Sequence, residues 1–185
     1  MASETASLSR WIPWSTAAID LDWDAVYVEQ MPRVYNFFRY RVGDGAEAED
    51  LTSATFERAW RARGRYRAEQ AGIATWLFTI ARRVAIDHYR SRRPHVALEE
   101  AGELAAPGSA EDEAVRRSDG EHLLRLLAGL PERPRELLAL KYGAGLTNRA
   151  IARVLGLGES NVGTILHRTL ADLRARWDRK ENHRG

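Results

Sequence analysis

The stretch LTNRAIARVLGLGESNVGTILHRTLADL, residues 146–173, decides the fold of this chain. Apolar residues recur there at helical spacing, the pattern breaks at Gly156-Leu157-Gly158, and it resumes from Val162. The pattern predicts two helices joined by a three-residue turn, which is a helix-turn-helix arrangement. In such a motif the first helix crosses the phosphate backbone of DNA, and the second presents its N-terminal residues to base edges in the major groove.

The second helix of this motif carries hydrogen-bonding side chains on the face opposite its apolar residues. These side chains are Ser160, Asn161, Thr164, His167 and Arg168. All of them can bond to bases or phosphates, so the sequence predicts a DNA-reading face. Ser160 lies beside the glycine turn and is expected to be the N-cap of the helix. The alternative interpretation is an ordinary helical hairpin whose polar face is only solvated.

Composition limits the classes of protein to be considered. The chain has 185 residues, of which 44% are hydrophobic, enough to form one large or two small domains. It has no cysteine, which excludes disulfides, thiolate metal sites and cysteine nucleophiles. No stretch approaches the ~20 apolar residues of a membrane span, and no basic segment followed by a hydrophobic run opens the chain. We expect a soluble, cytoplasmic protein without membrane insertion.

Arginine dominates the positive charge. The net charge is only +2, but among the 28 basic residues just Lys141 and Lys180 are lysines. The planar arginine side chain suits bidentate contact with phosphate and guanine. A GC-rich genome also produces an arginine-rich composition without selection for binding, so the positions of the arginines must decide between the two interpretations.

The first 22 residues have no periodicity and are expected to be a flexible extension. Trp11 and Trp14 are unusual in a solvated tail, and the alternative is a short segment that docks on the body or on a partner. A helix follows from Asp24.

Within that first helix, apolar residues at steps of four, three and four predict a buried stripe of Tyr27, Met31, Val34 and Phe38. Pro32 interrupts the stripe and predicts a kink or a fresh helix start.

The next helix, residues 47–63, runs into a positive cluster. Its arginines are Arg58, Arg61, Arg63, Arg65 and Arg67, with Tyr66 among them. Such a cluster can hold one nucleic-acid strand, with phosphates on the arginines and a base on the ring. The alternative is a solvated surface with one aromatic side chain tucked into the core.

A third helix, from Thr75 to about Ser91, gathers a second group of cations at its C-terminal end. They are Arg82, Arg83, His88, Arg90, Arg92 and Arg93, with Asp87 as the only acid. The helix dipole favours cations there and explains some of the clustering without DNA. Six potential cations on one short helix nevertheless predict a separate nucleic-acid footprint.

An acidic stretch, residues 94–113, separates two basic, helical halves. It is too polar to be buried and is expected to be a flexible linker. The sequence therefore predicts an all-α fold of two small helical domains, residues 23–93 and 114–180, with a short tail at 181–185.

Three segments together resemble bacterial RNA polymerase sigma factors of the extracytoplasmic-function (ECF) subfamily. AEDLTSATFERAW (Ala48–Trp60) looks like the polymerase-binding helix of that family, and ATWLFTIARRVAIDHYRSRR (Ala74–Arg93) looks like its promoter-melting helix. Leu130–Arg174 is similar to its promoter-reading domain. The three segments occur in the order of the family, with an acidic linker in the usual place.

The resemblance implies a set of partners and sites. It implies no cofactor, no metal and no catalysed reaction. Core RNA polymerase would be bound through the clamp of its largest subunit, by Asp50, Phe56, Arg58 and Trp60, and through the flap of its second subunit. The minus-ten promoter element would be held by the third helix and the preceding loop, through Arg65, Tyr66, Arg67, Arg82, Arg83, Asp87, His88, Arg90, Arg92 and Arg93. The minus-thirty-five element would be read by the helix-turn-helix face defined above. Members of the family are commonly sequestered by an anti-sigma protein, and we expect the free chain to be monomeric.

The chain departs from the family pattern at several positions. Ala150 stands where an acid is usual, and Gly163-Thr164-Ile165 replaces a Lys-Ser-Arg-like run. Ser53-Ala54 replaces a usual Gln-Glu pair, and Arg83 stands where asparagine is common. The first two differences bear on the phosphate contacts and the promoter sequence, and the others indicate an atypical subgroup, weaker binding to core polymerase or an altered partner.

Two competing classes explain less of the sequence. A stand-alone helix-turn-helix regulator that binds an operator accounts for the second half but leaves the first half without a role. An enzyme needs a nucleophile or metal cluster with supporting groups. The five histidines are scattered without ligand spacing, which argues against a catalytic site.

Overall fold

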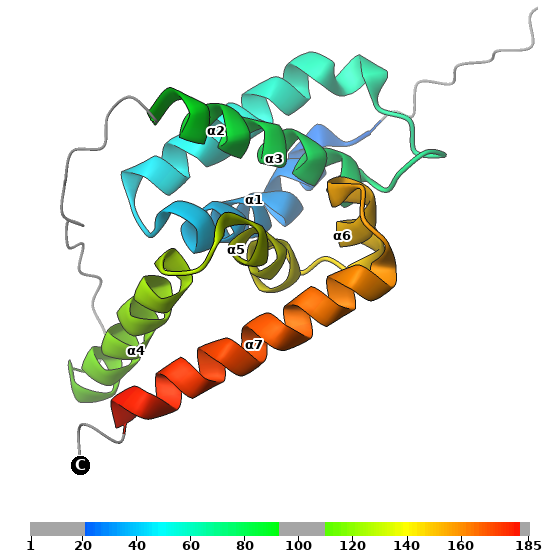
Figure 1. Ribbon diagram of the computed structural model, residues 1–185. Coiled ribbons are helices and arrows are strands. Elements are labelled where there is room, and N and C mark those ends of the chain that lie inside the picture. Colours follow the sequence, from blue (N-terminus) through cyan, green and yellow to red (C-terminus); the bar gives the residue numbers. More distant parts are fainter. Residues whose placement is uncertain (1–20, 93–109, 182–185) are drawn as a thin grey trace, which may run out of the picture.

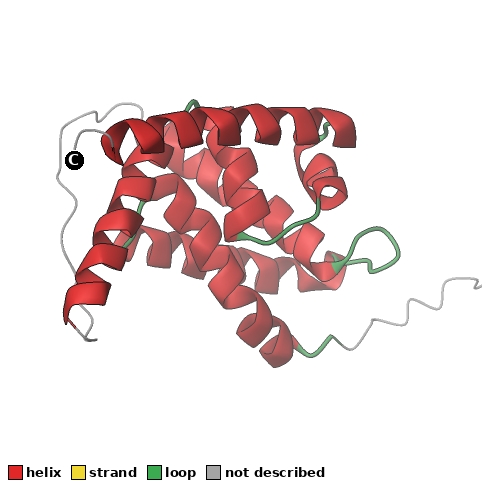
Figure 2. Ribbon diagram, turned by 90° about the horizontal axis from the view of Figure 1, so that it is seen from below, coloured by secondary structure: helices red, strands yellow, loops and turns green. Residues whose placement is uncertain are grey.

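The computed structural model describes residues 21–92 and 110–181, and every regular element in these ranges is a helix (Figures 1 and 2). The predicted all-α class is confirmed. The elements are α1 (Trp23–Val42), α2 (Ala46–Ala62), the 3-10 turn η1 (Arg63–Arg65), α3 (Ile73–Arg92), α4 (Ala110–Ala128), α5 (Glu132–Leu138), the π-helical segment η2 (Ala139–Gly143), α6 (Asn148–Leu155) and α7 (Glu159–Glu181).

Helix α1 is one uninterrupted element. It starts where the Asp22 carboxylate accepts hydrogen bonds from the backbone N–H groups of Asp24 and Ala25, at 3.1 and 3.0 Å. It ends at Gly43, whose φ of 95° glycine adopts without strain. Pro32 lies inside the helix, so the fresh helix start considered for that position does not occur.

The buried face of α1 differs from the predicted stripe. Val34 and Phe38 are fully buried as expected, but Tyr27 is 51% exposed and Met31 is 37% exposed. Their places on the buried face are taken by other residues, including two polar ones. The buried residues of α1 are Val26, Gln30, Val34, Phe37, Phe38 and Arg41. Periodicity of apolar residues alone misassigned the face because a polar side chain can be buried when it has partners.

The start of α4 lies within the stretch that the sequence predicts to be an acidic linker. Helix α4 begins at Ala110, so residues 110–113 are helical, whereas residues 93–109 lie outside the described ranges. The N-terminal extension with Trp11 and Trp14 and the last four residues of the chain also lie outside them.

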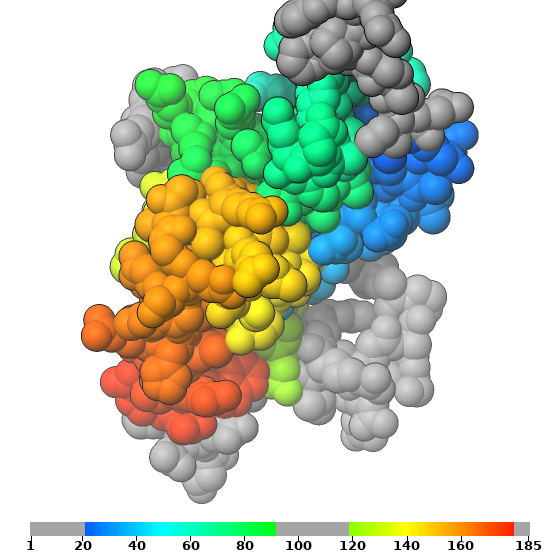
Figure 3. Space-filling model, turned by 90° about the vertical axis from the view of Figure 1, so that its right-hand side faces the viewer, coloured from blue at the N-terminus to red at the C-terminus, as the bar shows by residue number. Residues whose placement is uncertain are grey.

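The two helical halves, α1–α3 and α4–α7, pack against each other. Segment η2 lies on α1, and α6 lies against α3, so the buried apolar residues of both halves form one continuous cluster. Figure 3 shows the residues of α6 and the start of α7, in yellow and orange, directly against those of α3, in green. In Figure 1 the long helix α7 runs from α6 to the start of α4 and closes one side of the molecule.

Gly143 of η2 lies close to the backbone of α1. A Cβ atom added to Gly143 would lie 2.8 Å from the backbone oxygen of Asn36 and 3.1 Å from Cα of Phe37, both on α1. Only a residue without a side chain permits this contact.

Phe37→Ala tests the corrected face of α1. Phe37 is fully buried between Phe38 and Phe78, at ring-centroid distances of 5.1 and 5.7 Å. Its truncation is expected to lower the free energy of unfolding by about 3–5 kcal/mol. Val28→Ala, on the same helix but 73% exposed, is expected to change it by no more than about 0.5 kcal/mol. Urea unfolding followed by circular dichroism measures both, and equal losses would contradict this assignment.

Candidate nucleic-acid interface

The predicted helix-turn-helix is present. Thr147 caps α6, because its side-chain oxygen accepts a hydrogen bond from the Ala150 N–H at 3.2 Å. Gly156 ends α6 in the left-handed conformation, with φ 66° and ψ 38°, and α7 starts at Glu159. An ion pair of 3.5 Å between Arg149 and Glu159 spans the turn.

The predicted reading face of α7 is exposed over its whole length. Ser160, Asn161, Thr164, His167 and Arg168 are all exposed, whereas the opposite face is buried through Val162, Leu166, Thr169 and Leu173. The helix thus presents polar side chains outward from a fixed apolar base. This is the geometry that insertion into a major groove requires.

The sequence predicted Ser160 as the N-cap of α7, and this prediction is wrong. Ser160 is the second residue of the helix, and its carbonyl accepts a hydrogen bond from the Thr164 hydroxyl at 3.0 Å. The helix starts two residues earlier than a Ser160 N-cap implies, because Leu157 and Gly158 complete the turn, with the Leu157 N–H bonded back to Ala152.

Of the departures from the family pattern in this motif, Ala150, Gly163 and Ile165 are half-buried, whereas Thr164 lies on the exposed face. Ala150 and Ile165 are half-buried and pack against the core, which explains why apolar residues are accommodated there. A Cβ at Gly163 would make an ordinary contact of 3.7 Å with the Asn148 amide nitrogen. Nothing in the structure therefore requires glycine at position 163.

The arginine-rich end of α2 and the following turn form an exposed strip around one aromatic ring. Arg65 and Arg67 are exposed, and Arg67 donates to the backbone oxygens of Gly64 and Tyr66 at 2.9 Å. Tyr66 is half-buried, with its ring 5.4 Å from that of Trp76. Burial, followed by the nearby Glu69 charge, raises the pKa of Tyr66 above its usual value.

The cations of α3 do not all face one surface. Arg83 and Arg90 are exposed, whereas Arg82 reaches across to the second half and donates to Glu136 at 3.1 Å. His88 pairs with Glu47 of α2 at 2.5 Å. The side chain of Arg92 and the whole of Arg93 lie outside the described residues.

The predicted polymerase-binding residues lie along α2. Asp50 is exposed. Arg58, which was predicted to bind polymerase, pairs at 2.6 Å with Asp87 of α3, which was predicted to bind the minus-ten element. Phe56 packs its ring edge against Tyr27 at 4.8 Å. Trp60 is 50% exposed.

Trp60 is held between two neighbours. Its ring meets that of Trp23 at 5.8 Å, and the Arg63 guanidinium lies 3.8 Å from its centroid. The exposed part of the indole thus belongs to a fixed side chain.

The sequence missed an apolar patch beside these residues. Tyr27, Val28 and Met31 of α1 are exposed, and the contact between Tyr27 and Phe56 makes their surface continuous with α2. Sequence reasoning had placed Tyr27 and Met31 in the core. The signal available in the sequence was that Phe37 and Phe38 already supply large apolar side chains for a buried face of the same helix.

Comparison with known proteins assigns the family. Residues 26–95 match the family model of Sigma-70 region 2, and residues 121–173 match that of Sigma-70 region 4. The RNA polymerase sigma factor CarQ of Myxococcus xanthus is 34% identical over 149 residues, which cover 80% of this chain and 85% of CarQ. The ECF RNA polymerase sigma factor BldN of Streptomyces coelicolor is 33% identical over 80% of this chain, which spans 57% of the length of BldN.

The chain is an ECF sigma factor. The fold of this sigma factor also resembles a solved one. The sigma factor RpoE of Bartonella quintana, crystallised in complex with the anti-sigma factor NepR, matches with a TM-score of 0.65 at 21% identity. The match covers 83% of this chain and 95% of that one, and at such identity it supports the fold alone.

Neither a metal-binding cluster nor a membrane-spanning helix occurs in the part of the sigma factor that the structure describes. Within residues 21–92 and 110–181, no group of three or more histidine and acidic residues is placed to hold a metal ion. None of the helices described there is both long and apolar enough to cross a bilayer.

Proposed function

We propose that this sigma factor divides its task among three surfaces: α2 with the exposed side of α1 for core RNA polymerase, α3 with the preceding turn for the minus-ten element, and α7 for the minus-thirty-five element. The observation that carries the proposal is the reading face of α7, where all the predicted side chains are exposed above a buried apolar base. The chain catalyses no reaction and needs no cofactor, and it acts in the cytoplasm.

The minus-thirty-five surface combines base and phosphate contacts. Asn161 and Ser160 lie in the first turn of α7, the part of a recognition helix that reaches base edges. Arg168 lies two turns further along and is exposed, in the position of a backbone contact. Arg149 and Arg153, exposed on α6, add positive charge where the first helix of such a motif crosses the phosphates.

The minus-ten surface combines the exposed arginines of α3 with an aromatic turn. Arg83 and Arg90 are available for duplex phosphates, and the turn around Tyr66 carries further arginines. Extruding a base from the non-template strand costs a few kcal/mol of stacking, which contacts in a pocket offset. Tyr66 and Trp76 supply ring surface for such a base.

The polymerase surface is the apolar patch that spans α1 and α2. Exposed aromatic and aliphatic side chains gathered in this way are typical of a protein interface. Asp50 and the Arg58–Asp87 pair give the patch a charged border. A second contact of α4–α7 with the polymerase flap completes the holoenzyme. The stand-alone regulator is less well supported because it leaves this patch without a partner.

An anti-sigma protein is the natural regulator of such a chain. The Bartonella RpoE structure contains one, NepR. A protein of that kind would compete with polymerase for the same apolar patch.

In vitro transcription tests the function directly. Purified core RNA polymerase, this protein and a fragmented genomic DNA library are combined, and the start sites of the transcripts are sequenced. We expect defined starts that share two upstream elements at fixed spacing. No starts, together with no co-elution with core polymerase, would leave a stand-alone DNA-binding regulator as the better account.

Arg168→Ala tests the phosphate contact of α7. The variant is expected to bind promoter duplexes more weakly, by a similar factor for all sequences, and to reduce the slope of log K against log salt by about 1. Arg174→Ala is the matched control, an exposed arginine further along the same helix on a different face. Fluorescence anisotropy at several salt concentrations measures the slopes, and equal slopes for wild type and Arg168→Ala would exclude the contact.

Trp60→Ala tests the polymerase surface. Loss of this half-exposed indole is expected to weaken binding to core polymerase at least tenfold, an effect of about 1.4 kcal/mol or more. Arg61→Ala removes the neighbouring side chain, which pairs only with Glu57 among the contacts described, and is expected to have little effect. Co-elution and thermal unfolding are measured together, so that a loss of binding caused by unfolding is recognised. Unchanged binding by folded Trp60→Ala would contradict the assignment.

A further inference from the structure

The exposed apolar side chains of the described residues gather at one place, along the first turns of α1 and the C-terminal half of α2. Of the five large apolar side chains that are strongly exposed in those residues, four lie there: Tyr27, Val28, Met31 and Trp60. Asp24, also exposed, lies one turn before Val28 and gives this apolar patch an acidic edge. Apolar surface concentrated in this way indicates a contact with another segment or molecule.

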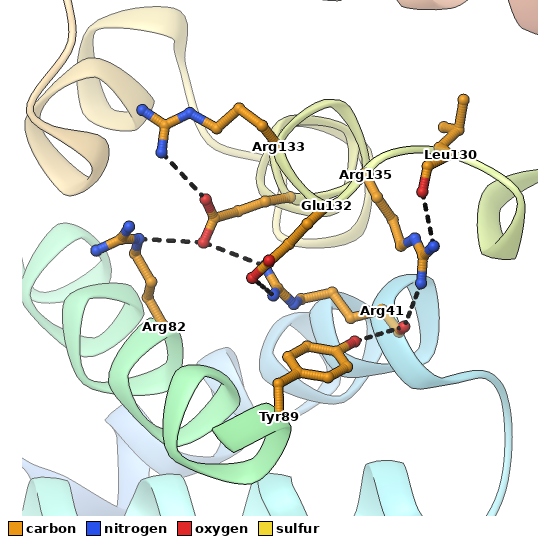
Figure 4. A network of polar contacts seen from close by, with 8 residues as sticks. Arg41, Arg82, Tyr89, Leu130, Glu132, Arg133 and Arg135 are labelled. Carbon is orange, nitrogen blue, oxygen red and sulfur yellow. Dashed lines mark hydrogen bonds and ion pairs between the residues drawn. The ribbon is translucent and has the colours of Figure 1, made fainter. Parts of the chain in front are cut away.

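The second half of the chain covers a different side of α1. Nε of Arg33 donates to the backbone oxygen of Ala144 at 2.8 Å. Arg41 pairs with Glu136 of α5 at 3.1 Å, in the network that Figure 4 shows. Arg33 lies five residues after Val28, which is about 140° around the helix at about 100° per residue. The packing of α4–α7 on α1 therefore leaves the apolar patch open.

Aromatic side chains give the patch a fixed shape. Trp23 of α1 faces Trp60 of α2 at 5.8 Å between ring centroids, and Tyr27 faces Phe56 at 4.8 Å, both edge to face. On each helix the two rings are four residues apart, which is about 6 Å along the axis. The two pairs thus lie side by side between α1 and α2, and they form an aromatic surface whose side chains are held by one another.

The segment Trp11-Ile12-Pro13-Trp14 has the chemistry that such a surface binds. Proline fixes its own φ and restricts the residue before it to extended backbone, so this sequence favours polyproline II geometry. With three residues per turn, side chains at positions 11 and 14 would project from one side of the segment, about 9 Å apart. Extended segments that contain proline are recognised by aromatic surfaces. Arg10, the only lysine or arginine among the first 20 residues, complements the acidic edge at Asp24.

The length of chain before α1 allows this segment to reach the patch. Eight residues lead from Trp14 to Asp22, the N-cap of α1, and they span up to about 26–29 Å when extended. Met31, the far end of the patch, lies about 12 Å along α1 from Trp23. The segment can therefore fold back over the patch with length to spare. Because it is tethered to the same chain, its effective concentration at the patch is in the millimolar range.

We propose that residues 11–14 dock on the apolar patch in the free chain and are displaced when core RNA polymerase binds there. The patch belongs to the surface that the proposed function gives to polymerase, so the inference rests on that function for its consequence but not for the docking itself. Docked chains cannot bind polymerase through this surface. Docking therefore lowers the apparent affinity for polymerase by the fraction of chains that are undocked.

Quenching of a dye on the patch tests the docking in the full chain. Because the chain has no cysteine, Val28→Cys provides the only thiol for bimane, whose fluorescence is quenched on contact with indole. Substituting both Trp11→Ala and Trp14→Ala is expected to make this dye brighter in the free protein. The same dye on Ala171→Cys, exposed on α7, is expected to keep its intensity.

Binding to core polymerase measures the consequence, in chains that carry neither dye nor cysteine. The variant with Trp11→Ala and Trp14→Ala is expected to bind about tenfold more tightly than wild type, which corresponds to a docked fraction of about nine tenths. The matched control is Ser15→Ala with Thr16→Ala, which changes the same stretch without removing an aromatic ring and is expected to bind as wild type does. Circular dichroism checks that all variants keep their helical content.

The outcomes separate the docking from the proposed function. Unchanged brightness at position 28 would overturn the docking, and a difference in brightness that disappears on dilution would overturn it in favour of a second copy of the chain on the patch. A brighter dye with unchanged or weaker polymerase binding would reject competition between the segment and polymerase. A brighter dye with no polymerase binding by any variant would keep the docking and reject the sigma-factor function.

Discussion

The ion pair between Arg41 and Glu136 is the constraint on which the arrangement of the two halves depends. Both side chains are almost completely buried, at 1% and 5% exposure, and they come from opposite halves of the chain. Burying two charges costs as much as their attraction returns, so such a pair adds little net stability. Removing one partner, however, leaves an uncompensated buried charge. The pair therefore specifies which faces meet rather than how strongly they adhere, and apolar contacts around η2 supply the attraction.

Much of the fold could be predicted from the sequence because it depends on local signals. Helical periodicity and the glycines of the turn were enough to predict the helix-turn-helix. All of the predicted reading residues on α7 are exposed. Helices α2 and α3 also lie close to their predicted bounds. These features are set within a few residues along the chain, where spacing and turn chemistry act directly.

The errors arose where contacts distant in sequence decide the outcome. Tyr27 and Met31 have the spacing of core residues, but Gln30 and Arg41 take part of the buried face of α1 because each has a polar partner there. For Gln30 one such partner is Arg33, at 2.9 Å. The contact of Arg82 with Glu136 could not be predicted, since it joins residues 54 positions apart. A contact between residues so far apart leaves no periodic pattern in the sequence.

Arg82 also links two traits that selection would otherwise adjust separately. A substitution there would remove the contact with Glu136 of the other half, and under the function proposed above it would also weaken promoter binding. Changes at this position are thus expected to be tolerated only together with changes around Glu136. Among related sequences the two positions should covary, whereas the exposed Arg83, one residue away and free of this double role, can diverge as promoters diverge.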